Sequence, residues 1–294
     1  HSFPTRRSSD LALRSVAELC CDAGVPMIVH AEDHAVLAHY SDLNPDTSDN
    51  NKLRPPEAEI SAVEQAIGLS AATGCSTHFF HISTEGAMQR IIVARRNGID
   101  VTCGVCPHHV FFLSSDAMRD PALFKVYPPL RETEDAEYLL DAIRNGEVDV
   151  LQSDHAPHLL SEKRKPFPES PAGLSGVQEL LSAGLELVAQ KLISLKTLEK
   201  LLCHNPRRIH GIAPKDISLG ASATFTLVAP EMETVVRREN VVSRAGWSPY
   251  EGVKFSGSVR HVLYEGRLVV RDGKVISRPN GRPLEKADKN DRDC

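Results

Sequence analysis

Four short apolar runs, each followed by polar residues and then by a helical pattern, constrain the fold of this chain more than any other feature. The runs lie at residues 26–29, 77–83, 100–105 and 148–154, and the helical patterns at 57–72, 85–97, 133–145, 176–190 and 195–203. Strands that alternate with helices at this spacing predict an α/β fold with a parallel sheet. Four such units amount to half of a (β/α)8 barrel, so residues 12–212 are predicted to form strands 5–8 of one.

The pattern changes after Lys215, where the helical periodicity stops. Short β-rich pieces follow at residues 223–228, 233–236, 258–264 and 267–270, with a turn signal at Asp272-Gly273. Residues 213–280 are therefore predicted to form part of a small β-sandwich domain. The charged segment 281–294 is expected to be a disordered tail. The opening segment 1–11 resembles a translated sequencing adapter and is expected to be an artefact or disordered.

Composition excludes several classes of protein. Of the 294 residues, 41% are hydrophobic and 25% are charged, which is typical of a soluble globular protein rather than a disordered chain. The net charge of −5 gives no electrostatic case for a nucleic-acid partner. No apolar run approaches the roughly 18 residues of a membrane span. Seven cysteines in a chain of this length do not form the pattern of a disulfide framework, so we predict a reducing, cytoplasmic location.

Residues able to bind a metal stand at the end of each predicted parallel strand. These are His30, His81, the pair His108-His109 and Asp154. The carboxyl ends of parallel strands meet at one edge, which is where barrel enzymes carry their active sites. One such histidine is usually a hydrogen-bonded core residue, but four consecutive strand ends are hard to explain by packing. Neutral imidazole and carboxylate are ligands that suit zinc.

Five motifs in this order resemble the cyclic-amide branch of the amidohydrolase superfamily, which contains the dihydroorotases, allantoinases and hydantoinases. They are HAED at 30–33, HIST at 81–84, CPHH at 106–109, PPLR at 128–131 and SDHAPH at 153–158. The SDHAPH motif is most similar to that of class I dihydroorotases. HNP at 204–206 and SRAGWSPYEG at 243–252 extend the resemblance, which covers residues 12–280.

The resemblance implies a barrel with one or two divalent metal ions, taken to be zinc, and a small β-sandwich. It implies that His30 and His81 are metal ligands and that Asp154 both touches metal and transfers protons. The remaining implied contacts, all with substrate, are His158, Tyr127 beside the PPLR loop, Pro171 and Gly173. The implied reaction is the hydrolysis or formation of a cyclic amide. In a dihydroorotase this reaction interconverts carbamoyl aspartate and dihydroorotate for pyrimidine synthesis, in an enzyme that is a homo-oligomer.

Two departures from the family pattern affect this prediction. The HxH pair and the bridging carboxylate of the family are not found in the sequence and are expected to precede residue 12. The second metal site is then incomplete, and the 294 residues alone are expected to be inactive. Tyr127 stands where dihydroorotases usually have Asn, which leaves allantoinase and dihydropyrimidinase or hydantoinase activities open. A non-catalytic structural partner related to dihydroorotase is the alternative from another class.

Several polar residues have a structural interpretation beside the functional one. His108 and His109 either support the site from behind or contact substrate. Cys103 and Cys106 lack a second CxxC pair, which favours buried small residues over a zinc knuckle. Glu32 either orients His30 or only lies at the barrel mouth. The charged run 162–165 is expected to be a solvated loop.

Overall fold

A four-stranded parallel sheet organises the first half of the chain. The structure, a computed structural model, describes residues 6–278, 281 and 283. Its strands are β1 (Met27–Val29), β2 (Thr77–Phe79), β3 (Val101–Val105) and β4 (Val150–Leu151), in the spatial order β1-β2-β3-β4. Every neighbouring pair is parallel, and the register places Met27 beside Thr77 and Thr77 beside Val101. This confirms the predicted α/β class.

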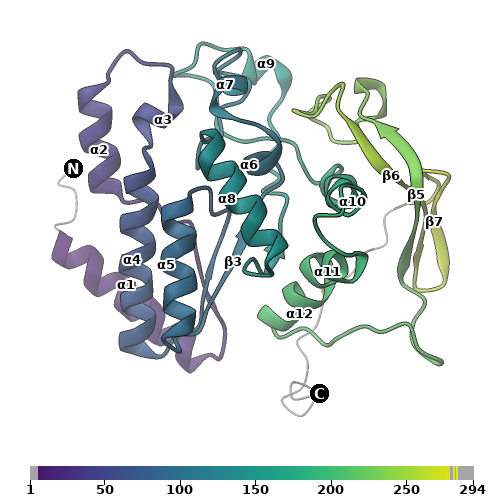
Figure 1. The fold of residues 1–294 in the computed structure, drawn as a ribbon, viewed down its shortest axis with the longest axis horizontal. Helices are drawn as coiled ribbons and strands as arrows, with labels where there is room; N and C mark the ends of the chain where they lie inside the picture. The colour runs from purple at the N-terminus through teal and green to yellow at the C-terminus, as the bar shows by residue number, and fades with distance from the viewer. Residues whose placement is uncertain (1–5, 279–280, 282, 284–294) are drawn as a thin grey trace.

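Helices pack along one face of this sheet, where they stand side by side in Figure 1. They are α1 (Arg6–Asp22), α4 (Pro56–Thr73), α5 (Glu85–Arg96) and α8 (Thr133–Arg144). The largest core cluster fills the space between helices and strands and includes Phe79, Ile82, Met88, Ile91, Leu139, Ile143 and Leu151, each at most 2% exposed. The other face is more open, because Ile28 and Phe80 remain 44% and 37% exposed.

Further helices lie in the connections. They are α2 (His34–Leu43), α3 (Asn50–Leu53), α6 (His108–Phe111), α7 (Ser114–Ala117), α9 (Leu160–Lys163), α10 (Leu180–Ala189), α11 (Leu195–Glu199), the π-helix η1 (Lys200–His204), α12 (Asn205–Ile209) and the 3-10 helix η2 (Arg238–Asn240). Segment 41–56, which is rich in Asn, Asp and Pro as loops are, contains the end of α2 and all of α3. Neither helix buries a residue, so neither has an apolar stripe that a sequence pattern could reveal.

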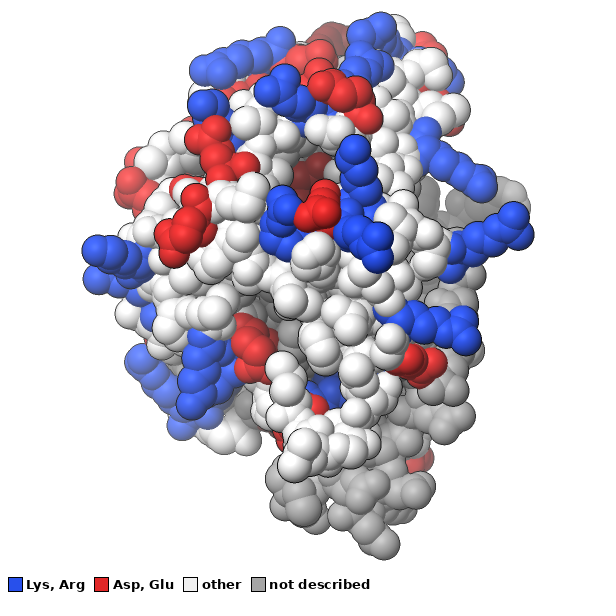
Figure 2. Space-filling view, turned by 90° about the vertical axis from the view of Figure 1, so that its right-hand side faces the viewer, with Lys and Arg blue, Asp and Glu red and all other residues white. Residues whose placement is uncertain are grey.

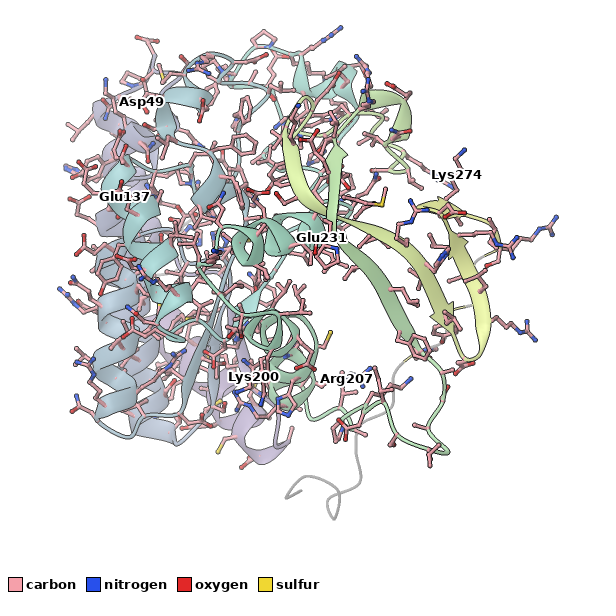
Figure 3. The ribbon with its side chains drawn as sticks, turned by 45° about the vertical axis from the view of Figure 1, so that its right-hand side comes forward. Asp49, Glu137, Lys200, Arg207, Glu231 and Lys274 are labelled. Carbon is pink, nitrogen blue, oxygen red and sulfur yellow. The ribbon has the colours of Figure 1, made fainter. Side chains whose placement is uncertain are left out.

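A second, antiparallel sheet follows the barrel-like region. Its strands are β5 (Phe225–Val235), β6 (Lys254–Tyr264), β7 (Arg267–Arg271) and β8 (Lys274–Val275), paired in chain order. Figure 3 shows this sheet with Glu231 on β5 and Lys274 on β8. The predicted strands 223–228 and 233–236 are one continuous strand, interrupted only by register shifts. Helix α10 packs against β6, where the Ser256 amide donates to Glu186 Oε2 at 2.6 Å.

The described residues stop short of both ends of the chain. Of the opening segment, residues 1–5 lie outside the described residues, whereas residues 6–11 form the beginning of α1. Most of segment 281–294 also lies outside them. On the face shown in Figure 2, basic and acidic side chains are interspersed. None of the described helices is both long enough and apolar enough to span a membrane.

Candidate metal and substrate site

Three residues predicted as metal ligands stand just beyond the carboxyl ends of parallel strands. His30 directly follows β1, His81 is two residues past β2, and Asp154 is three residues past β4. The backbones of His81 and Asp154 have φ angles of 38° and 43°, a left-handed conformation that few residues other than glycine adopt. Such backbone strain costs about 1–3 kcal/mol per residue and is concentrated at functional sites. At Asp154 it also explains why β4 ends earlier than predicted.

The imidazoles of His30 and His81 face each other. Nδ1 of His30 lies 2.9 Å from Nε2 of His81, and the rings meet edge to face. Burial lowers the pKa of His81 to about 4, and the nearby charge of His30 adds to this effect. The His81 ring is therefore neutral at pH 7, the form in which imidazole binds metals.

Glu32 orients His30 from the side away from His81. Its carboxylate accepts a hydrogen bond from Nε2 of His30 at 2.8 Å. It also accepts hydrogen bonds from both Nε and Nη2 of Arg54, and Nη2 lies 2.5 Å from Oε2. Burial favours a raised pKa for Glu32, but the hydrogen bonds from His30 and Arg54 outweigh it and hold that pKa below its usual value. Of the two interpretations left open by the sequence, the orienting one describes this geometry.

Tyr127 belongs to the same chain of contacts. The guanidinium of Arg54 stacks over its ring, with Cζ 3.7 Å from the ring centroid. A cation over an aromatic face at this distance is attracted to it. Tyr127 thereby buttresses Arg54, which in turn holds Glu32 and, through it, His30.

Asp154 provides the carboxylate of the group. Burial raises its pKa above the usual value, while the charge of His30 partly opposes that shift. A carboxylate can accept a proton from an attacking water and return it to a leaving group, which is what general acid–base catalysis requires.

The donor atoms of this group fit a divalent metal such as zinc. Because Nε2 of His30 donates to Glu32, its Nδ1 carries the lone pair that faces Nε2 of His81. A carboxylate that holds the far nitrogen of a histidine is the usual support of a metal-binding imidazole. Two imidazole nitrogens and a carboxylate oxygen are ligands that zinc accepts. Among the described residues, however, Asp154 does not form with His30 and His81 a group whose ligand atoms all lie within 4.8 Å of one another.

The motifs around these ligands also start the following helices. Asp33 caps α2 by accepting a hydrogen bond from the amide of Ala35 at 2.9 Å. Thr84 caps α5 by accepting one from the amide of Ala87 at 3.3 Å. The HAED and HIST motifs therefore each combine a strand end, a histidine predicted to bind metal and a helix cap.

A buried ion pair lies behind the site and was not predicted. Glu59 and Arg131, each 1% exposed, are 3.6 Å apart, and both contact Ser83. The hydroxyl of Ser83 donates to Glu59, and Arg131 Nε donates to that hydroxyl at 3.0 Å. Burial raises the pKa of Glu59 to about 7, against the opposing charge of Arg131. Because Arg131 ends the PPLR motif, this network fastens that loop to α4 and to the HIST motif.

The other residues predicted to contact substrate form a second group, in the loop after β4. His158 Nε2 donates to the carbonyl of Ala172 at 3.1 Å. Gly173 donates its amide to Lys125 O at 2.9 Å, and its φ of 139° is open only to glycine. A Cβ on Gly173 would lie 2.6 Å from the backbone oxygen of Ala156.

Lys163 corrects one expectation from the sequence. Within the run predicted to be a solvated loop, Lys163 is 0% exposed. Its Nζ donates to Lys125 O at 3.0 Å and to Pro171 O at 2.9 Å. The two carbonyls compensate the buried ammonium, so Lys163 ties the loop at Pro171 to the segment that leads into Tyr127.

Trp247 from the SRAGWSPYEG motif joins the same group. Its Nε1 donates to His158 O at 2.8 Å, and its ring packs with Val126, Leu130 and Leu174. The segment before β6 therefore closes over the loops that carry His158 and Tyr127. This explains how a motif distant in sequence contributes to the site.

Cys106, His108 and His109 also come together, at the end of β3. One ligand atom from each lies within 4.8 Å of the others, and all three residues are buried. In the sequence, Cys106 stands in a CxxC spacing with Cys103 and the histidines stand as a pair, so no pattern joins the three. Their association depends on the tight turn at Pro107, which no spacing rule for zinc motifs describes.

The chain is similar to several cyclic-amide hydrolases, although no family model matches it. It is 34% identical over 269 residues to a dihydroorotase of Thermococcus kodakarensis, covering 92% of this chain and 61% of that relative. It is 36% identical over 283 residues to an allantoinase of Rubrobacter xylanophilus, covering 94% and 62%. The chain therefore spans about three fifths of the length of these relatives.

Solved structures of hydantoinases have a fold similar to that of this chain. An L-hydantoinase (dihydropyrimidinase) from Arthrobacter aurescens superposes with a TM-score of 0.86 at 25% identity, covering 91% of this chain and 62% of that one. A D-hydantoinase from a Bacillus sp. AR9 superposes with a TM-score of 0.81 at 28% identity, covering 93% and 62%.

Proposed function

The chain belongs to the cyclic-amide hydrolase branch of the amidohydrolase superfamily, and on this premise we propose that it carries metal ligands and the proton-transfer residue of a dihydroorotase. The reaction is the reversible hydrolysis of dihydroorotate to carbamoyl aspartate. The dihydroorotase relative and the SDHAPH motif at 153–158 support this substrate.

One observation carries the proposal. Nδ1 of His30 and Nε2 of His81 face each other at 2.9 Å, while Glu32 holds the far nitrogen of His30. A carboxylate in this position is the usual support of a metal-binding imidazole.

Each of these residues has a separate role in the proposed reaction. A divalent metal held by His30, His81 and Asp154 supplies a Lewis acid when bound. Asp154 accepts the proton of the attacking water and returns it to the ring nitrogen when the amide bond breaks. His158 contacts the substrate from the loop that Lys163 and Trp247 hold in place, and Pro171 and Gly173 close that loop over the ring.

Tyr127 favours a second candidate. A phenol that stacks on Arg54 offers a cyclic amide a different set of partners from the Asn usual in dihydroorotases. The allantoinase relative and the hydantoinase structures belong to the same branch. Hydrolysis of allantoin or of a dihydropyrimidine is therefore the alternative.

The test is an assay of the protein expressed from its complete gene and loaded with zinc. Dihydroorotate, allantoin and dihydrouracil are compared by kcat/KM, with dihydroorotate expected to lead. A preference for either of the other two overturns the first choice in favour of the second. If a zinc-loaded, folded protein turns over none of the three, the chain is the non-catalytic structural relative instead.

Three further assignments belong to the same proposal. Zinc is the metal, because imidazole and carboxylate are its usual ligands. The location is the cytoplasm, in keeping with six free cysteines among the described residues. The assembly is a homo-oligomer that binds a small-molecule substrate.

A further inference from the structure

Three buried side chains at the end of β3 form a group distinct from the ligands of the proposed zinc centre. Cys106 and His109 are 0% exposed, and His108 is 1% exposed. One donor atom from each lies within 4.8 Å of the others. No member of the group is among His30, His81 and Asp154.

Two imidazole nitrogens in this group need a partner. Nε2 of His109 donates to Pro128 O at 3.2 Å, so its Nδ1 carries a lone pair. Within the described part of the chain, neither this Nδ1 nor Nε2 of His108 has a hydrogen-bond partner, and both atoms are buried. Buried polar atoms are almost always satisfied in native proteins, so each orphan requires an explanation.

We propose that Cys106, His108 and His109 form a second, sulfur-containing metal site for zinc or another thiophilic divalent ion. A thiolate and two imidazoles are ligands that zinc binds readily. The cation accepts the lone pairs of His108 Nε2 and His109 Nδ1, and the thiol of Cys106 releases its proton to solvent on binding.

The surroundings are compatible with this binding. Burial lowers the pKa of His108 to about 3, so its imidazole is neutral and free to coordinate. Burial raises the pKa of Cys106, and the negative charge of Asp154 raises it further. The positive charge of Arg131 lowers the pKa of His109 and so opposes further positive charge in the group.

The position of the group indicates what the metal does. His108 and His109 begin α6, Cys106 follows β3 directly, and His109 holds Pro128 of the PPLR loop. A metal here joins the end of the strand to the loop that carries Tyr127 and Arg131. We assign it a structural role, which makes the inference independent of the proposed reaction.

Cobalt distinguishes this site from the proposed catalytic one. Co²⁺ bound to thiolate gives a near-ultraviolet charge-transfer band, whereas His30, His81 and Asp154 contain no sulfur and give none. The titration uses the complete protein with Cys20, Cys21, Cys203 and Cys294 changed to serine, because exposed or terminal thiols bind cobalt adventitiously. We expect one equivalent of cobalt to produce the band.

Matched variants locate the ligand. Cys106→Ser should abolish the band, and Cys103→Ser, a buried thiol three residues earlier, should leave it intact. His30→Ala should also leave it, because that residue belongs to the other site. Absence of the band, or its persistence in Cys106→Ser, overturns the proposal.

A second measurement covers the case in which Cys106→Ser fails to fold. X-ray absorption of the zinc-loaded serine background should contain a zinc–sulfur shell at about 2.3 Å. A first shell made only of nitrogen and oxygen overturns the proposal without any variant at Cys106. Neither measurement depends on turnover, so the proposed function is tested separately.

Discussion

Glu32 accepts a hydrogen bond from Nε2 of His30 at 2.8 Å, and this contact fixes which nitrogen of His30 is free. With the proton on Nε2, the lone pair of Nδ1 faces His81. The Glu32 side chain is only 1% exposed and is itself held by Arg54. The metal-binding form of His30 is thus set by a carboxylate that contacts neither metal nor substrate in the proposed mechanism.

Replacement of that carboxylate should weaken metal binding. In Glu32→Gln the side chain keeps its size but loses its charge, so both His30 and Arg54 lose a charged acceptor. We expect zinc affinity to fall about tenfold to a hundredfold, the usual effect of losing such a support. Competition with a chromophoric chelator measures it. Glu64→Gln, which removes an exposed acid paired with Arg90, is the control, and equal affinities in the two variants would contradict the role of Glu32.

Asp154→Asn tests proton transfer. The amide has the same shape but cannot take a proton from water, so turnover should be lost in both directions while the fold is retained. Initial rates for ring opening and ring closure, beside a circular dichroism spectrum, measure this. Asp141→Asn, at an exposed position on α8, should behave as wild type. Near-normal rates in Asp154→Asn would remove this residue from the mechanism.

The close approach of His30 and His81 could be predicted from the sequence because one physical rule places them. Parallel strands end at a common edge, so His30 after β1 and His81 after β2 had to be close if both runs were strands. The α/β class was predictable for the same reason, since the alternation of apolar runs and helical patterns needs no tertiary information.

Other features depended on contacts between segments far apart in the chain. Lys163 sits in a charged run that is usually solvated, and only the carbonyls of Lys125 and Pro171 make its burial possible. Glu59 occupies the first turn of α4, where acids are common at the surface, and its partner Arg131 is 72 residues away. Helix α2 buries no residue, so no apolar periodicity marks it.

Glu59 should make the stability of the protein depend on pH. Its pKa is raised from 4.5 to about 7 in the folded state, so the folded protein binds the proton more tightly than the unfolded chain does. The resulting stabilisation is fully present below pH 4.5 and is lost as pH rises through 7. Relative to Glu59→Gln, which cannot ionise, the wild type should lose up to about 3 kcal/mol of unfolding free energy between pH 4.5 and 7.5.

Urea unfolding of the two proteins across this pH range tests the prediction. The difference between them, rather than either curve alone, isolates Glu59 from other titrating groups. A difference that stays constant, or that grows in favour of the wild type as pH rises, would show that Glu59 is ionised throughout and that its pairing with Arg131 outweighs its burial.

Gly173→Ala should disrupt the loop that carries His158. The backbone at φ 139° is strained for any residue with a Cβ, and that atom would lie 2.6 Å from Ala156 O, which cannot move aside easily. We expect KM to rise at least tenfold with a smaller change in zinc affinity, because two of the three proposed ligands, His30 and His81, lie outside this loop. Gly68→Ala, at an open position in the middle of α4, is the control. An unchanged KM would show that the loop takes no part in substrate binding.

Lys163→Met should destabilise the same loop from within. The substitution keeps most of the apolar stem but leaves the carbonyl of Pro171 without its donor, at a cost of about 1–3 kcal/mol, while Lys125 O keeps the Gly173 amide. Removal of the desolvated ammonium, whose pKa burial lowers to about 8, offsets part of that loss. We therefore expect a net loss of about 1 kcal/mol in unfolding free energy. Lys165→Met, two residues on and exposed, should change stability by less than about 0.5 kcal/mol. Equal stability of the two variants would mean that the buried ammonium contributes nothing to holding the loop, and that packing around Trp247 alone is sufficient.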